Sequence, residues 1–104
     1  MRHYGHFIDG QEVLPADGEY FGTDNPYSGE TWAMIARGRA ADVDAAVASA
    51  KTAGENAWST LTASARGKLL RRFADLVIDN ADRLAKIEMT DNGKLAAEVI
   101  AQVK

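Results

Sequence analysis

Two carboxylates, Glu88 and Asp91, have the spacing most suggestive of a functional site. In the helix predicted around them, Leu84 and Ile87 define the apolar face, and helical periodicity places both carboxylates within about 60° of it. An inward-facing carboxylate must be paired, protonated or bound to a metal, because an unpaired buried charge is very costly. Pairing with an Arg, a Lys or a backbone amide, or fraying toward solvent, is the simplest explanation. The alternatives are a hard-cation site completed by carbonyls of a turn such as residues 23–25, or an acid/base pair, which would need a cleft.

The other reactive side chains form no recognised catalytic pattern. His3 and His6 occur as H-x-x-H, but along a strand this spacing directs them to opposite faces, and zinc would need two further ligands. The sequence has no cysteine, which excludes disulfides, thiolate metal sites and a cysteine nucleophile within these residues. Gly67 and Gly93 each precede a lysine, but neither lies in a P-loop pattern. The residues by themselves therefore reveal no chemistry.

Residues 1–39 are predicted to form strands and turns. Short extended runs are expected at residues 7–8, 13–14, 20–23 and 31–35. Asp9 and Gly10 separate the first two runs and favour a tight hairpin turn, because both residues tolerate positive φ. A second turn is expected at residues 15–18. The pattern predicts a hairpin or meander.

From about residue 40 the apolar period changes to that of a helix. Helices are expected at about 41–53, with Asp42 and Asp44 in the first turn where the helix dipole favours anions, and from a cap at Thr62 or Ser64 to about 79. Two more are expected at 81–90, ended by Gly93 in a left-handed conformation, and from 94 onward. Apolar residues cover more than half of the second helix, so we expect it to be covered on two sides. The large aromatic side chains are expected to anchor the core: Trp32, Trp58 and Phe73. The predicted fold is therefore α+β, with an N-terminal β-hairpin or meander over residues 1–39 and about four α-helices over residues 40–104.

The composition describes an ordinary folded protein. Of the 104 residues, 46% are hydrophobic and 26% are charged, and the formal net charge is −3. The basic residues are dispersed, so no basic stripe favours nucleic-acid binding. No apolar run is long enough to span a membrane, and the first residues lack the apolar region of a secretory signal. We expect a cytoplasmic protein.

The last segment predicts an apolar face that needs a cover. Its apolar residues lie on one arc of a helix: Leu95, Ala96, Val99, Ile100 and Val103. No Gly, Asn or Pro follows to end this helix. We therefore expect the chain to be the front part of a larger protein. In isolation, exposed Val99, Ile100 and Val103 are expected to promote a homo-oligomer or an exchange of helices between copies.

Several short segments follow one another in a specific order: Phe7-Ile-Asp-Gly10, Asn25-Pro-Tyr-Ser-Gly-Glu30, Ala41-Asp-Val-Asp-Ala-Ala-Val47, Trp58, Arg66-Gly-Lys-Leu-Leu70, Ala74-Asp-Leu76 and Asp91-Asn-Gly-Lys94. This succession resembles the start of the NAD(P)-dependent aldehyde dehydrogenase superfamily and covers almost the whole chain. Because members of that family are much longer, the chain resembles only about their first fifth, which in them is part of an α/β NAD(P)-binding domain.

The resemblance implies the oxidation of an aldehyde to a carboxylate. In the family, a cysteine forms a thiohemiacetal, a glutamate acts as general base, and hydride passes to the nicotinamide of NAD or NADP. No segment here matches the cysteine or glutamate motifs or the dinucleotide-binding strands, so the resemblance assigns no catalytic or cofactor-binding residue. Some members bind a structural monovalent cation, and the matching positions here are Thr23, Asp24 and Asp91.

Two hypotheses about function follow. In the first, the chain is an N-terminal fragment of an aldehyde dehydrogenase and is inactive alone. In the second, it is a self-associating helical interaction module without catalytic activity.

Overall fold

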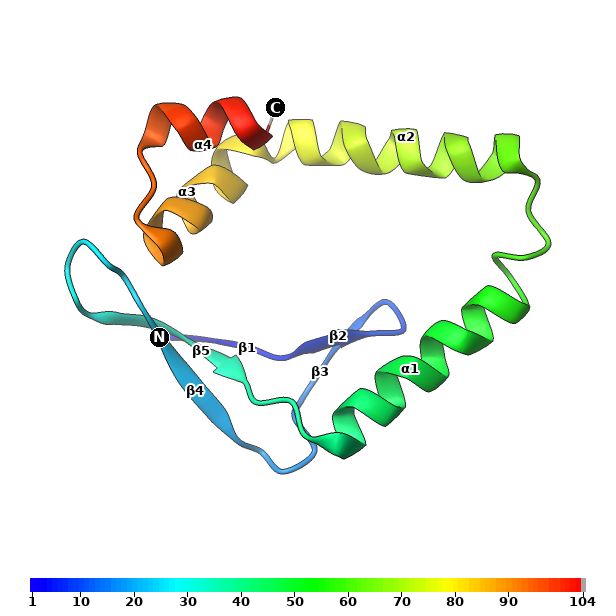
Figure 1. The fold of residues 1–104 in the computed structure, drawn as a ribbon, viewed down its shortest axis with the longest axis horizontal. Coiled ribbons are helices and arrows are strands. Elements are labelled where there is room, and N and C mark those ends of the chain that lie inside the picture. Colours follow the sequence, from blue (N-terminus) through cyan, green and yellow to red (C-terminus); the bar gives the residue numbers. More distant parts are fainter. Residues whose placement is uncertain (104) are drawn as a thin grey trace. The chain divides into compact units, whose positions relative to one another are not determined.

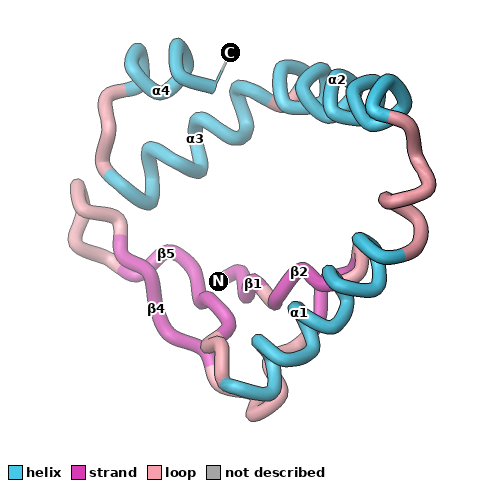
Figure 2. The backbone as a smooth tube through the Cα atoms, turned by 45° about the vertical axis from the view of Figure 1, so that its right-hand side comes forward, coloured by secondary structure: helices cyan, strands magenta, loops and turns pink. Residues whose placement is uncertain are grey.

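The computed structural model describes residues 1–103, except for the side chains of Ala96, Ile100 and Val103. The chain divides into two compact units, the first formed by residues 1–23 and 31–61 and the second by residues 24–30 and 62–104. Within the described residues, strands precede helices, as Figures 1 and 2 show. This order confirms the predicted α+β fold.

The strands are short and all lie within the first 36 residues. Their bounds are β1 Arg2–Tyr4, β2 His6–Ile8, β3 Gln11–Val13, β4 Tyr20–Asp24 and β5 Thr31–Ala36. Strands β2 and β3 form the predicted antiparallel hairpin, in which Ile8 lies opposite Gln11. The turn between them has positive φ at both Asp9 (53°) and Gly10 (73°). These angles match the twist of the flanking strands, and they confirm the prediction made from the two residue types.

The second sheet differs from a simple meander. Its strand order is β1-β5-β4, and β1 pairs in parallel with β5, so that Arg2 lies opposite Ala33. Strand β5 is central and contributes fully buried Ala33 (0% exposed). The parallel pairing escaped prediction because Arg2, His3 and Tyr4 show no apolar alternation, and because a parallel partner can be distant in the sequence.

The first helix, α1, spans Ala40–Glu55 and packs against β2. It begins where the backbone amide of Arg39 donates a hydrogen bond to the Asp42 carboxylate, which satisfies one of the amides at the helix start. The outward residues Val43 and Val47 are more than half exposed. Helix α1 therefore buries only Asp42, while Ala46 and Ser49 are half-buried.

The second unit contains the other helices: α2 Ala63–Asp79, α3 Ala81–Asn92 and α4 Ala96–Val103. Thr62 caps α2 by accepting a hydrogen bond from the amide of Ala65, and Gly93 ends α3 in the left-handed region (φ 75°). Both caps were predicted from the residue types. Helix α4 packs against α3, and this contact buries Val99 completely.

Three expectations about burial were wrong. Helix α2 is not covered on two sides, since none of its residues is buried and Phe73 is 66% exposed. Trp58 is also partly exposed (39%), so neither aromatic ring anchors a core. Val99 was expected to be exposed, but its side chain lies against α3. The side chains of Ile100 and Val103 lie outside the described residues, as does Lys104.

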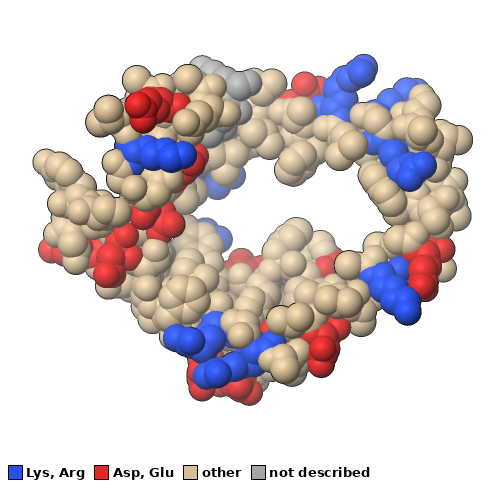
Figure 3. All heavy atoms as spheres, viewed as in Figure 1, with Lys and Arg blue, Asp and Glu red and all other residues tan. Residues whose placement is uncertain are grey.

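On the face that Figure 3 displays, acidic and basic side chains of the described residues stand in small groups separated by uncharged residues, and neither sign forms one extended patch. None of the described helices combines the length and the hydropathy required to cross a bilayer.

Candidate functional site

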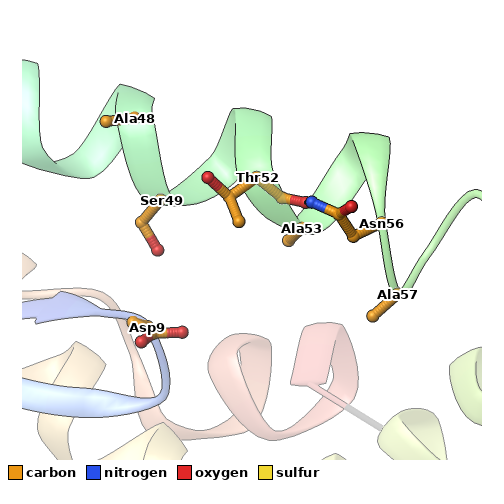
Figure 4. Close-up of a pocket in the computed structure, with 7 residues that line it drawn as sticks. All are labelled: Asp9, Ala48, Ser49, Thr52, Ala53, Asn56 and Ala57. Atoms are coloured by element: carbon orange, nitrogen blue, oxygen red, sulfur yellow. The ribbon is translucent and has the colours of Figure 1, made fainter.

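The first unit is hollowed where the β2–β3 hairpin meets α1. One hollow has a volume of about 480 Å³ and is lined by Asp9 of the hairpin turn together with residues of α1 and the turn after it: Ala48, Ser49, Thr52, Ala53, Asn56 and Ala57 (Figure 4). Alanine methyl groups form much of its wall. The Ser49 hydroxyl has no histidine beside it in this lining, so the hollow does not present an activated nucleophile.

A neighbouring hollow contains a histidine and a carboxylate. His6 and Asp42 line it, and the other lining residues carry no reactive group: Phe7, Ile8, Gly38, Val43 and Ala46. The His6 Nε2 atom lies 3.5 Å from Asp42 Oδ1. A histidine beside a carboxylate can orient a proton acceptor, but this lining supplies no hydroxyl or thiol for it to activate.

The Asp42 carboxylate connects three segments of the chain. Its Oδ2 accepts a hydrogen bond from the amide of Arg39 (2.9 Å), and its Oδ1 accepts one from the amide of Ala16 (2.9 Å). These bonds, that from Arg39 first, hold the pKa of Asp42 below its ordinary value, with a smaller contribution from His6. Only 8% of Asp42 is exposed. We infer that Asp42 anchors the loop of residue 16 and the start of α1 to each other.

His6 approaches the same carboxylate from strand β2. Its Nε2 atom is buried, and it has no hydrogen-bond partner among the described residues. The distance of 3.5 Å to Asp42 Oδ1 is beyond a good hydrogen bond, so the contact is electrostatic at most. His3, by contrast, lies on β1 and packs edge-on against the ring of Tyr20 (4.9 Å between centroids). The two histidines therefore have separate environments.

The structure explains Glu88 by the simplest of the three alternatives. Its Oε1 atom lies 3.3 Å from Lys94 Nζ and accepts a hydrogen bond from Asn92. Glu88 is also 36% exposed at its side chain, so it is not a buried charge. The pairing with a nearby lysine, predicted as one possibility, is confirmed.

The residues assigned to a cation by resemblance lie at the ends of two elements. Asp24 ends β4, and Asp91 is exposed in the last turn of α3; both belong to the second unit, whereas Thr23 belongs to the first. In the second unit, Pro26 packs against Gly93, because a Cβ built on Gly93 would lie 3.3 Å from Pro26 Cβ. The turn after Asp24 therefore contacts the end of α3. Among the described residues, no group of three or more His, Asp and Glu side chains is placed to hold a metal ion.

Sequence reasoning missed the cluster around Asp42. It noted the acidic residues at the start of the first helix but assigned them only to the helix dipole. The available signal was an aspartate three residues after Arg39, the residue at the observed start of the helix, because a side chain at this position can reach back to the amide of the capping residue. The partners Ala16 and His6 carry no sequence signal, since they meet Asp42 only through the fold.

Comparison with known proteins identifies the chain's relatives. The family model described as "Aldehyde dehydrogenase family" matches residues 13–104. A dehydrogenase of (Z)-2-((N-methylformamido)methylene)-5-hydroxybutyrolactone from Acinetobacter baylyi is 46% identical over 104 residues, covering 99% of this chain and 21% of the relative. Mitochondrial 10-formyltetrahydrofolate dehydrogenase of Mus musculus is 46% identical over 91 residues, covering 86% of this chain and 10% of the relative.

Solved structures give the same result. A mutant aldehyde dehydrogenase from Bacillus cereus matches 95% of this chain and 20% of its own, with a TM-score of 0.92 and 32% identity. Betaine aldehyde dehydrogenase from Staphylococcus aureus, solved with NAD+, matches 96% of this chain and 20% of its own, with a TM-score of 0.90 and 33% identity. The chain thus spans a fifth or less of these two structures. It belongs to the aldehyde dehydrogenase family and represents an N-terminal portion of it.

Proposed function

We propose that this chain is the N-terminal structural segment of an NAD(P)-dependent aldehyde dehydrogenase and that it has no catalytic activity of its own. The complete enzyme would oxidise an aldehyde to a carboxylate and reduce NAD or NADP. The match of residues 13–104 to the family model carries the assignment to this enzyme class. The proposed inactivity rests on the absence of any cysteine from the sequence, because the family's reaction proceeds through a cysteine thiohemiacetal.

The described side chains support a structural role for the segment. The hollow at the hairpin turn is lined by alanines and by polar side chains without a histidine among them. In the neighbouring hollow, the pair of His6 and Asp42 has no hydroxyl or thiol beside it. Asp42 instead accepts backbone hydrogen bonds that fix the start of α1. The chain's own residues therefore position backbone, while nicotinamide chemistry would be supplied by the remainder of an enzyme.

An activity assay tests this proposal directly. The purified chain is incubated with NAD+ or NADP+ and a panel of short aliphatic, aromatic and betaine-type aldehydes, and the appearance of reduced nicotinamide is followed by absorbance. A full-length family member under the same conditions is the positive control. We expect no reduction above the rate without protein. Aldehyde-dependent formation of NADH or NADPH by the pure chain would refute the inactivity.

Self-association is a second candidate function, and one observation favours it. Helix α2 exposes large apolar side chains, among them Leu70 (61%) and Phe73 (66%). Isolated chains with contiguous exposed apolar surface tend to associate. In this alternative the chain is a helical interaction module, assembled as a homo-oligomer or by exchange of helices. A molar mass that remains monomeric at high concentration would contradict it.

We also propose a monovalent cation at Thr23, Asp24 and Asp91, with the first two contributing backbone carbonyls. The packing of Pro26 against Gly93 supports it, since it brings the turn after Asp24 to the end of α3. These oxygen donors suit a hard cation. The test compares melting in NaCl or KCl with melting in choline chloride. We expect Na+ or K+ to raise the melting temperature of the chain. Asp91→Asn should abolish this stabilisation, whereas the control Asp82→Asn should retain it. Equal melting temperatures in all three salts would contradict the site.

A further inference from the structure

Asn92 and Gly93, at the end of α3, form the only Asn-Gly pair in the sequence. In such a pair the backbone nitrogen of the glycine can attack the side-chain carbonyl carbon of the asparagine, because glycine has no Cβ to crowd the approach. Both residues are exposed, so water reaches them. The pair therefore has the residue types and the access to water that spontaneous deamidation requires.

The reaction consumes only water. A bond forms between Gly93 N and Asn92 Cγ while the bond from Cγ to Nδ2 breaks. The proton of the Gly93 amide passes to solvent, and Nδ2 takes up a proton and leaves as ammonia. Water then hydrolyses one of the two carbonyls of the cyclic imide, which gives either aspartate or isoaspartate. The chain thereby exchanges ammonia for water and gains one negative charge.

The closed end of α3 protects Asn92 from this reaction. The amide of Gly93 donates a hydrogen bond to Met89 O (2.9 Å), so the attacking nitrogen is held by the helix. The Asn92 side chain is held as well, since Oδ1 accepts a hydrogen bond from the amide of Lys94 (2.9 Å) and Nδ2 donates one to Glu88 (3.4 Å). Ring closure requires this turn to open. Helix ends fray, so the opening is a local event that leaves the rest of the fold intact.

We propose that Asn92 is a deamidation site, and that opening of the last turn of α3 controls the rate of its modification. The modification weakens the turn that protected the residue. The new carboxylate lies four residues after Glu88 in the last turn of α3, where like charges repel and the helix dipole disfavours an anion. Isoaspartate also lengthens the backbone just before Gly93, the residue that packs against Pro26. Deamidation therefore loosens the end of α3.

The test measures deamidation in the intact chain, aged at neutral pH in buffer and in denaturing urea. Brief trypsin digestion then releases residues 87–94, and chromatography with mass spectrometry separates the asparagine, aspartate and isoaspartate forms. We expect Asn92 to react roughly tenfold more slowly in buffer than in urea, because opening the turn breaks the hydrogen bonds of Gly93 and Asn92. The released peptide, aged in both solvents, corrects for any direct effect of urea.

Asn80 is the matched internal control. It also lies at a helix end, where its Nδ2 donates to Leu76 O (2.8 Å), but the residue after it is Ala81. In urea Asn92 should react faster than Asn80, and equal rates at the two residues would overturn the site. A rate at Asn92 that is the same in buffer and in urea, after correction, would overturn the control by helix opening.

Asn92→Asp tests the effect on α3, since it carries the charge of one product. Its melting temperature should fall below that of the parent chain. Gln11→Glu makes the same change of charge in the exposed strand β3, and it should melt nearly like the parent. An unchanged melting temperature for Asn92→Asp would overturn the loosening of α3. The proposal goes beyond the proposed function, and none of these assays measures aldehyde oxidation, so the enzyme assignment is tested separately.

Discussion

The contact between α3 and α4 makes a quantitative prediction, in which truncating a valine costs more than truncating a phenylalanine. Val99 is fully buried (0% exposed) against α3, whereas Phe73 on α2 is 66% exposed. Val99→Ala removes two buried methyl groups, at about 0.8 kcal/mol each, and adds a cavity term. A gain of roughly 0.5 kcal/mol in helix propensity partly offsets this loss. The free energy of unfolding should therefore fall by about 1–2.5 kcal/mol.

Phe73→Ala should cost much less. A fully buried phenylalanine loses about 3–5 kcal/mol on truncation, but only a third of this residue is removed from solvent. The expected loss is about 1 kcal/mol, and the gain in helix propensity reduces it further to about 0.5 kcal/mol. Leu95→Ala, at a residue 71% exposed, is the control and should be nearly neutral.

The assay is urea unfolding followed by circular dichroism, at a protein concentration low enough to keep every variant monomeric. Thermal melting provides a second measure, since each kcal/mol corresponds to about 4–8 °C for a domain of this size. The reasoning would be refuted if Phe73→Ala destabilised the monomer by about 3 kcal/mol while Val99→Ala had no effect. That result would mean that the hydrophobic core lies along α2.

Two further predictions concern Asp42 and the glycines of the second unit. Asp42→Asn should destabilise the first unit at neutral pH, because the pKa of Asp42 is held below its ordinary value in the folded chain. A carboxylate of this kind stabilises the fold above its unfolded pKa, so the difference in stability from the parent should shrink below about pH 4. Gly93→Ala should cost more than Gly29→Ala in denaturant unfolding, because both residues have positive φ but only at Gly93 would the new methyl group contact Pro26. Equal costs at the two glycines would argue against that contact.

The parts of the fold that were predictable depend on local backbone chemistry. Asp9 and Gly10 specify a turn because they accept positive φ, and the structure has positive φ at both. Thr62 and Gly93 mark helix ends because each satisfies backbone groups that a helix leaves unpaired. Signals of this kind are complete within a few residues, so a sequence reveals them without knowledge of the rest of the fold.

The features that escaped prediction depend on contacts distant in sequence. The parallel pairing of β1 with β5 joins segments separated by a hairpin and a strand. The cluster around Asp42 required Ala16 and His6 to arrive from two other segments. Burial was misjudged for the same reason. An apolar helix such as α2 indicates that other residues must pack against it, but its sequence does not say whether those residues belong to this chain. The order of the short motifs predicted the family correctly, whereas single residue types did not predict a function.

A chimeric enzyme tests the central claim most directly. The Acinetobacter baylyi relative aligns with 99% of this chain over 21% of its own length, so its matching region can be replaced by this chain. If the chain is an N-terminal structural segment of this family, the chimera should fold and retain most of the parent's dehydrogenase activity. A chimera that melts like the parent enzyme but no longer oxidises the parent's hydroxybutyrolactone substrate would contradict this claim.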